Sequence, residues 1–426
     1  MTQRREVSSD DEGKRFEFDF LVLGGIVLRE QLRRRQPLNQ GRTVFAQLIS
    51  FLSHKQFNRC VARYGGNKSV RSFSCWDQFL TMAFAQLTYR ESLRDIEVCL
   101  AAQQRKLYHS GFGGPVKRST LADANEQRDW RIYRDFAHSL IRIARPLYAH
   151  SELGLELEAT AYAFDATTID LCLSLFPWAK FRKHKGAIKL HTLLEIHSAI
   201  PVFIAITAGD VHEVNLLDEL IPEPGSFIVM DRGFIDFQRL HRLHTALAFF
   251  VIRTKGNLAF RRRYSHPHDR ATGVRSDQTI VLTGPLSSRR FPLALRRVHY
   301  YSAETGQRIV LLTNNFSIPA LTVAALYRYR WQIELFFKWI KQHLRIKSFF
   351  GTSDNSVRTQ IWIAVTVYVL VAIVKKRLGL KQDLYTLLQI LSLTLFEKTP
   401  ILSLLQQSRY NLEMVHDVNQ LQLLEI

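Results

Sequence analysis

The sequence predicts an α/β fold, in which a mixed sheet forms the core, carries a β-rich insertion and is flanked by helical N-terminal and C-terminal regions. Three observations predict this fold. Strand-like and helix-like segments alternate from about residue 155 to 255, which is the element order of a layered α/β domain. Turn signals and short strand-like runs follow over 257–316. Apolar residues recur at helical spacing before residue 150 and beyond residue 316.

The charge of the chain indicates an anionic partner. Its 426 residues include 58 Lys and Arg against 38 Asp and Glu, a net charge of +20. Hydrophobic residues make up 46% of the chain, which excludes wholesale disorder. Nucleic acid is therefore the first expectation and an anionic membrane the second. The longest apolar run, Ile361–Val374, is shorter than the roughly 20 residues of a spanning helix, so we expect a buried helix and no membrane partner.

The number and spacing of the cysteine residues indicate the cellular compartment in which we expect the protein. Four of them lie far apart in the sequence, with no C-x-x-C pair. This spacing supports neither a disulfide framework nor a structural zinc site. We therefore expect a cytoplasmic protein with reduced thiols.

The first 150 residues divide into two parts. Residues 1–42 mix charge runs with one apolar patch and predict a tail of uncertain order. Residues 43–150 are expected to be helical, and Ser92 and Thr120, each followed three residues later by aspartate, resemble helix caps. One helix face is formed by apolar residues at steps of three and four: Trp130, Tyr133, Phe136, Leu140 and Ile143. A basic helical domain suits DNA binding; a helical core with solvated charges is the alternative.

Residues 151–350 are predicted to form the core. The expected strands are Tyr162–Leu173, Leu190–Ile196, Val202–Thr207, Phe227–Met230 and Phe249–Arg253. The expected helices are Leu216–Ile221 and Phe237–Leu247. This order resembles a ribonuclease-H-like mixed sheet, in which the first and fourth strands are neighbours.

The segment 257–316 interrupts this core and is predicted to be a β-rich, basic insertion. Residues 251–308 carry twelve Lys and Arg but three acidic residues, so a large share of the excess charge lies here. Such a surface suits contact with phosphates; a charged, solvated loop is the alternative. Residues 351–426 are predicted to be a helical C-terminal region, where we expect a second copy of the chain to pair.

A helix predicted over 324–345 carries the strongest signal. At 100° per residue, its apolar residues fall in one arc of about 80°. Four other residues fall in a separate arc of about 60°: Tyr327, Arg330, Glu334 and Lys341. Arg and Lys suit phosphate oxygens, and a carboxylate suits a hard divalent cation. A salt-bridged helix face is the alternative interpretation.

Two aspartates strengthen the functional interpretation. Asp165 lies within the first predicted strand, and Asp231 directly follows the strand Phe227–Met230. A carboxylate in an apolar strand must be paired or bound to a metal, because an isolated buried charge is costly. If their strands are neighbours, the two aspartates face each other, and the late helix brings Glu334 beside them. Three carboxylates so close together repel one another unless cations, such as two metal ions, neutralise them. Asp170 is a weaker alternative to Asp165.

These residues resemble a known family. The pattern Y-x2-R-x3-E-x6-K, formed by the four residues of the predicted helix, resembles the signature of IS4-family insertion-sequence transposases, a DDE group. Asp165 in FDATTIDL and Asp231 in VMDRGF resemble the regions of its first and second aspartates. Phe45–Glu97 resembles the helical N-terminal domain of one subgroup. The chain departs from many relatives at His212–Glu213, where they carry His-Asp.

The resemblance implies cut-and-paste DNA transposition at terminal inverted repeats. Asp165, Asp231 and Glu334 are then expected to be catalytic and to bind two Mg²⁺ or Mn²⁺ ions. The expected phosphate-binding residues are Tyr327, Arg330, Lys341, Arg232, Arg253 and Lys255. The expected partners are double-stranded DNA, as transposon ends and target, and a second copy in a synaptic homodimer. The expected location is the bacterial cytoplasm, at the nucleoid.

Two further DNA contacts are expected. Phe260 and Tyr264 are candidates for stacking on a flipped base. The basic stretch Lys180–Lys189 is a candidate DNA contact near the first aspartate, or a charged loop.

Three other functions stay open at this point. One is a DNA-binding repressor that has lost catalysis, which a metal-dependent cleavage assay separates from an enzyme. Another is a nuclease without strand transfer, which supplied target DNA and a search for joined product distinguish. The last is membrane association through the N-terminal apolar patch Phe20–Leu28, which deletion of residues 1–42 tests.

Overall fold

The computed structural model describes residues 41–149, 157–182, 185–254, 256–303, 305–343 and 349–407. Nearly all of the expected tail, Lys255 and residues 408–426 lie outside these ranges. The α-helices are α2 (Val44–Ile49), α3 (His54–Arg63), α4 (Cys75–Leu87), α5 (Leu93–Ala102), α6 (Gln104–Leu107), α7 (Arg118–Gln127), α8 (Arg131–Tyr148), α9 (Phe237–Thr245), α10 (Pro285–Arg290), α11 (Ala320–Tyr329), α12 (Trp331–Lys338), α13 (Asp354–Arg377), α14 (Leu384–Thr394) and α15 (Ile401–Gln407).

Shorter helical turns connect these elements. The 3-10 turns are η2 (Tyr108–Ser110), η3 (Glu213–Asp218), η4 (Arg232–Phe234) and η5 (Arg270–Thr272), and η6 (Trp339–His343) is π-helical. The strands are β1 (Ala161–Leu171), β2 (Lys180–Arg182), β3 (Lys185–Glu195), β4 (Ile200–Ala208), β5 (Phe227–Met230), β6 (Phe249–Arg253), β7 (Phe260–Ser265), β8 (Val274–Leu282), β9 (Leu295–Tyr301) and β10 (Arg308–Thr313).

All ten described strands belong to one mixed sheet. Its order is β2-β3-β1-β5-β6-β10-β9-β8-β7, and β4 pairs with β3. The three central strands, β1, β5 and β6, run parallel to one another, while the outer pairs are antiparallel. The predicted adjacency of the first and fourth strands is confirmed, because β1 pairs directly with β5.

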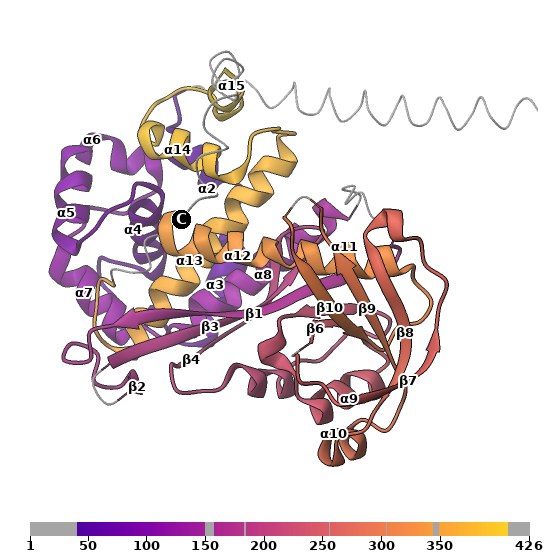
Figure 1. Ribbon diagram of the computed structural model, residues 1–426. Coiled ribbons are helices and arrows are strands. Elements are labelled where there is room, and N and C mark those ends of the chain that lie inside the picture. The colour runs from indigo at the N-terminus through magenta and orange to yellow at the C-terminus, as the bar shows by residue number, and fades with distance from the viewer. Residues whose placement is uncertain are drawn as a thin grey trace, which may run out of the picture.

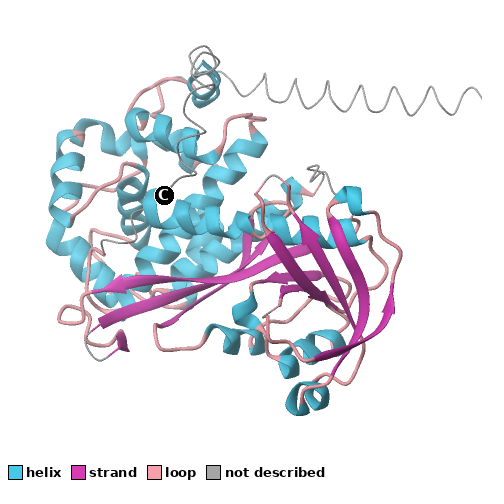
Figure 2. Ribbon diagram, viewed as in Figure 1, coloured by secondary structure: helices cyan, strands magenta, loops and turns pink. Residues whose placement is uncertain are grey.

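Side chains at alternate positions of the central strands belong to two hydrophobic cores, one on each face of the sheet. In β5, Phe227 and Val229 join a large core shared with the N-terminal and C-terminal helices, while Ile228 and Met230 join a smaller core on the opposite face. A strand with apolar residues on both faces must be covered on both sides. Helices α8 and α13 contact one another in the larger core, and α9 packs beside the smaller one. Figures 1 and 2 show the helical body at one end of the sheet and the β-rich segment at the other.

The apolar run near the C-terminal end forms the centre of α13. Among the described helices, α13 is long and apolar enough to cross a membrane by length and composition. Its apolar window is 94% buried inside the protein, however, against α8, α4 and α7. The expectation of a buried core helix is therefore confirmed.

Several predicted elements differ from the structure. The expected helix at 216–221 is the 3-10 turn η3, which starts earlier. Thr120 was expected to cap a helix, but α7 already begins at Arg118; Ser92 does cap α5, accepting a hydrogen bond from the Asp95 amide. The predicted single helix over 324–345 is also wrong. It divides into α11 and α12 at Arg330 and ends in the π-helical turn η6, so the predicted 60° arc is not one continuous face.

Candidate active site

The sheet aligns three polar side chains across its parallel centre. Phe164 pairs with Met230, and Met230 pairs with Ile252. The residues that follow these three are Asp165, Asp231 and Arg253. Because the three strands are parallel and in this register, the two aspartates and the arginine lie side by side across the sheet.

Asp165 is the more enclosed of the two aspartates. Its side chain is 19% exposed, and its Oδ1 accepts a hydrogen bond from the Ala166 amide at 2.8 Å. The pKa of this carboxyl is raised to about 6, chiefly by burial and in part by the carboxylates of Glu213 and Glu334, while the Ala166 amide and Arg330 act in the opposite direction. The site therefore disfavours a negative charge at Asp165 unless a cation lies beside it.

Arg330 supplies that cation. Its guanidinium donates to Asp165 Oδ2 at 2.9 Å and to Glu334 Oε1, so one side chain joins a strand carboxylate to a helix carboxylate. The position of Arg330 at the junction of α11 and α12 aims its side chain back toward the sheet edge. Its buried Nε has no hydrogen-bond partner among the described residues.

The other two signature residues also reach the sheet. The Tyr327 hydroxyl donates to Asp231 Oδ1 at 3.2 Å, and Lys341 Nζ donates to the carbonyl of Thr168 in β1 at 2.7 Å. Burial raises the pKa of the Tyr327 phenol, and the charge of Asp231 adds to the effect. Tyr327 is therefore a hydrogen-bond donor at neutral pH.

Two further charged residues lie near the site: Lys189, the last residue of the predicted basic stretch Lys180–Lys189, and Glu213, which sequence reasoning did not place there. Lys189 of β3 forms an ion pair with Glu213 of η3 at 3.6 Å and donates to the Val211 carbonyl at 2.9 Å. The Glu213 charge acts on Asp165, so it is part of the electrostatic environment of the site. The His212–Glu213 dipeptide was noticed in the sequence, but nothing in the spacing placed it beside β1.

The remaining predicted DNA-contact residues lie at different distances from the carboxylates and differ in exposure. Arg232 is exposed in η4, and Arg253 ends β6 beside Asp231. Lys255 lies outside the described residues. The alternative Asp170 is exposed on β1, away from the junction that Arg330 forms. The two aromatic candidates lie on β7: Phe260 is covered by the Arg297 guanidinium, 4.9 Å from the ring centre, whereas Tyr264 is 58% exposed.

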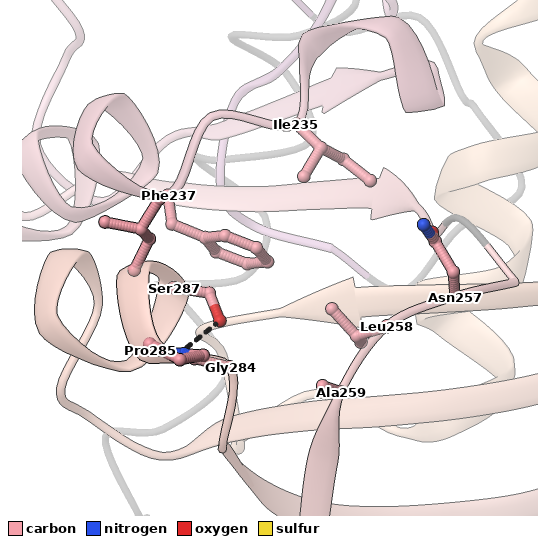
Figure 3. A pocket seen from close by; sticks show the side chains of 9 residues that line it. Ile235, Phe237, Asn257, Leu258, Ala259, Gly284, Pro285 and Ser287 are labelled. Carbon is pink, nitrogen blue, oxygen red and sulfur yellow. Dashed lines mark hydrogen bonds between the residues drawn. The ribbon is translucent and has the colours of Figure 1, made fainter.

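A pocket that the sequence did not indicate opens beyond η4. It has a volume of about 520 Å³ and lies between the start of α9 and the β-rich segment. Its lining is mostly apolar: Ile235, Phe237, Asn257, Leu258, Ala259, Gly284, Pro285, Leu286 and Ser287. Figure 3 shows the Phe237 ring directed into this space between Ile235 and Ser287.

The carboxylates have the chemistry, but not the closed geometry, of a metal centre. Within the described ranges, no three His, Cys, Asp or Glu side chains converge as a metal site. The expectation that three carboxylates surround one point is therefore not met in this arrangement, in which Asp165 and Glu334 share the Arg330 guanidinium and Asp231 is held by Tyr327. The oxygen donors of these carboxylates are nevertheless the ligands that Mg²⁺ and Mn²⁺ prefer.

Comparison with known proteins decides the family. Residues 156–370, half of the chain, match the family described as "Transposase DDE domain". The chain belongs to the DDE transposases. As a member, this transposase is a metal-dependent enzyme that cleaves DNA and transfers DNA strands. Residues 40–113 match a "Domain of unknown function (DUF4372)".

Individual relatives agree with the family. The transposase is 33% identical to "Putative transposase y4zB" of Sinorhizobium fredii, over 66% of this chain and 78% of that protein. It is 25% identical to "Putative transposase for insertion sequence element IS4SA" of Synechocystis, over 61% of this chain and 72% of that protein, which agrees with the IS4 resemblance. A solved piggyBac transposase synaptic complex with hairpin DNA has 12% identity and a TM-score of 0.43, with coverage of 85% of this chain and 80% of that one.

Proposed function

We propose that this transposase moves its insertion sequence by a cut-and-paste reaction in which Asp165, Asp231 and Glu334 are the catalytic carboxylates. The observation that carries the proposal is the bridge from Asp165 through Arg330 to Glu334, beside Asp231 on the adjacent parallel strand. It supports a ribonuclease-H-like core, with Asp165 within β1, Asp231 directly after the adjacent strand β5, and Glu334 on helix α12. The three carboxylates would hold two divalent ions, which activate a water or a DNA 3′-hydroxyl and stabilise the leaving oxygen when bound.

The surrounding residues take roles that follow from their contacts. Arg330 would exchange its carboxylate partners for a DNA phosphate, since a guanidinium fork suits both anions. Tyr327 would orient Asp231 and donate to a phosphate oxygen. Lys341, anchored on β1, and Arg253, at the end of β6, would add positive charge on either side of the carboxylates. The exposed Arg232 would contact the backbone farther out.

The other regions take supporting roles in this proposal. Residues 43–150 would bind DNA, the β-rich segment within 257–316 would contact phosphates, and 351–426 would contribute to a homodimer in the synaptic complex. The substrates are the inverted-repeat ends and target DNA in the bacterial cytoplasm, at the nucleoid.

A cleavage assay tests the carboxylate assignment. The purified chain, with Mg²⁺ and a duplex carrying the inverted repeat that flanks its own gene, should nick the transposon end. Glu334→Ala should lower the rate by at least about 100-fold, because a carboxylate that holds the ions is worth several kcal/mol of transition-state stabilisation. Asp170→Ala removes an exposed carboxylate from the same strand as Asp165 and should cut at the wild-type rate. Equal cleavage by Glu334→Ala and the wild type would show that the assignment is wrong.

A further inference from the structure

The N-terminal region contains a stretch in which positive charge is uncompensated. Residues 42–76 carry six Lys and Arg and no Asp or Glu. They lie within residues 40–113, which match the domain of unknown function. Most of these cations belong to α3 and to the loop that follows it. We define the α3 face as Lys55, Arg59, Lys68 and Arg71, all exposed.

The two sides of α3 differ sharply in chemistry. Phe57, Cys60 and Val61 are buried, and the Phe57 ring lies 4.9 to 6.2 Å from four other aromatic rings. Lys55 and Arg59 are spaced four residues apart on the outward side, and Arg63 continues the same row. The apolar side of α3 therefore holds the helix against the core, and the cations are exposed on its opposite side.

The loop after α3 is held in one conformation. The Gly66 amide donates to the Val61 carbonyl at 3.0 Å, and the Cys75 amide donates to Asn67 Oδ1 at 2.8 Å. Ser69 has a φ of 61°, in the left-handed region that a non-glycine residue rarely adopts. The loop therefore presents Lys68 and Arg71 from a defined position next to the C-terminal end of α3.

The nearby acidic residues do not neutralise this face. Asp135 accepts hydrogen bonds from Arg63, Arg134 and the Tyr64 hydroxyl, so Arg63 is ion-paired and is not counted in the face. Asp129 is bound to Arg131. Cations at the end of a helix also offset its dipole, but that role applies to Arg63 and not to Lys55 at the start.

We propose that the α3 face is a docking surface for the phosphate backbone of double-stranded DNA. Lys55 and Arg59 lie about one helical turn apart, about 6 Å along the helix axis, and Lys68 and Arg71 continue the row of exposed cations beyond the end of the helix. Such a row can contact several phosphates of one duplex at the same time. An anionic membrane fits less well, because the apolar side of α3 is buried and has nothing to insert into lipid. The inference rests on the proposed function, since DNA is the partner.

Salt-dependent binding tests this surface. The probe is a random-sequence DNA duplex, and the variant combines Lys55→Gln, Arg59→Gln, Lys68→Gln and Arg71→Gln in the full chain. Each phosphate contact contributes about 0.9 to the slope of log affinity against log salt. The slope should therefore fall by about 3 to 4, and the affinity at about 0.15 M salt should fall by at least tenfold.

The control substitutes four other exposed cations of the same region. Arg94→Gln, Arg105→Gln, Lys117→Gln and Arg118→Gln remove the same charge from α5, α6 and the start of α7. This variant should keep most of the slope. A version of the α3 face with Lys and Arg exchanged (Lys55→Arg, Arg59→Lys, Lys68→Arg, Arg71→Lys) should also keep it, because phosphates require only the charge. Equal losses in the control and the α3 variant would overturn the proposal.

Two further outcomes separate this proposal from others. Binding of a random duplex needs no catalytic carboxylate, so Asp165→Asn should bind it as the wild type does, whether or not the carboxylate assignment is correct. An unchanged slope in the α3 variant would overturn the docking surface and leave the cleavage proposal standing. Loss of binding to phosphatidylserine vesicles, with unchanged duplex binding, would assign the face to a membrane instead.

Discussion

At the scale of single residues, Arg330 governs the electrostatics of the site. Its guanidinium forms an ion pair with Asp165 at 2.9 Å, and burial already disfavours the anionic form of that carboxyl. The same group pairs with Glu334, which is more than half exposed. Removing the guanidinium therefore leaves Asp165 with neighbouring negative charges and without an ion-pair partner among the residues that the structure describes.

Arg330→Gln is expected to lower the free energy of unfolding by about 1–3 kcal/mol, the range for losing hydrogen bonds to a charged partner. Chemical denaturation measures this change. Mg²⁺ should restore more stability to the variant than to the wild type, because the carboxylates gain a replacement cation. Arg242→Gln breaks an exposed ion pair with Asp218 and should cost less than about 1 kcal/mol. Equal losses in the two variants would contradict the role given to Arg330.

His191 makes the stability of the fold sensitive to acid. It is fully buried in β3 and forms a 2.9 Å hydrogen bond with the Thr207 hydroxyl. Burial, with a smaller contribution from the charge of Lys189, lowers the pKa of this imidazole from 6.5 to about 4. Between these two pH values the unfolded chain binds a proton that the folded chain does not, so stability falls as pH falls.

The pH dependence can be isolated by substitution. His191→Gln should remove up to about 3 kcal/mol of the stability change between pH 6.5 and 4, the linkage value for such a pKa difference. Unfolding in denaturant at several pH values measures it. Thr207→Val keeps the imidazole while removing its partner, and should keep the acid sensitivity. A variant slope identical to that of the wild type would show that His191 does not titrate in this way.

At the scale of elements, short-range patterns predicted the centre of the sheet well. The bounds of β5 and β6 agree with the prediction because both strands are compact apolar runs between clear turns. Strand β7 was missed because FRRRYS has little apolar character, and only its pairing with β8 makes it a strand. The break at Arg330 was invisible because no Gly or Pro marks it.

Some features of the candidate site were likewise predictable from the sequence, and others were not. The adjacency of β1 and β5 was predictable from element order, and it places Asp165 beside Asp231. The contacts of Arg330 were not predictable, because they depend on where α11 turns into α12. Glu213 could not be placed either, since η3 is irregular and lies far from β1 in the sequence.

The charge of the β-rich segment includes one arginine that is not available to DNA. Arg296 forms a two-hydrogen-bond ion pair with Asp277, and both side chains are almost fully buried between β8 and β9. Asp277→Ala should cost about 3–5 kcal/mol, because it leaves a buried guanidinium unpaired. The double variant Asp277→Leu with Arg296→Met should cost less. Thermal denaturation compares the two, and a milder effect of the single variant would contradict the burial argument.

At the scale of the whole molecule, the sheet joins regions that the sequence suggested were separate. Strand β10 lies inside the predicted insertion yet pairs with β6 of the parallel centre. The smaller core likewise draws residues from both, including Phe250 and Leu312. The β-rich segment is therefore an extension of one structural unit.

Unfolding should reflect this continuity. Leu312→Ala empties a fully buried position in β10 and should cost about 2–5 kcal/mol. Calorimetry should show a single transition for the sheet, shifted to lower temperature as a whole. Leu286→Ala, in the exposed part of α10, should leave that transition in place. A separate early transition for the segment would indicate an independent domain.

The outermost strand has a consequence for the behaviour of the protein at high concentration. Strand β7 pairs on one side with β8, and its other edge is the end of the sheet. An unpaired edge can recruit another copy and start aggregation. Arg261, Arg262 and Arg263 line this edge, all exposed, and the register is shifted between Arg262 and Tyr264. Like charges and an irregular edge both oppose strand addition, so this basic run also protects solubility.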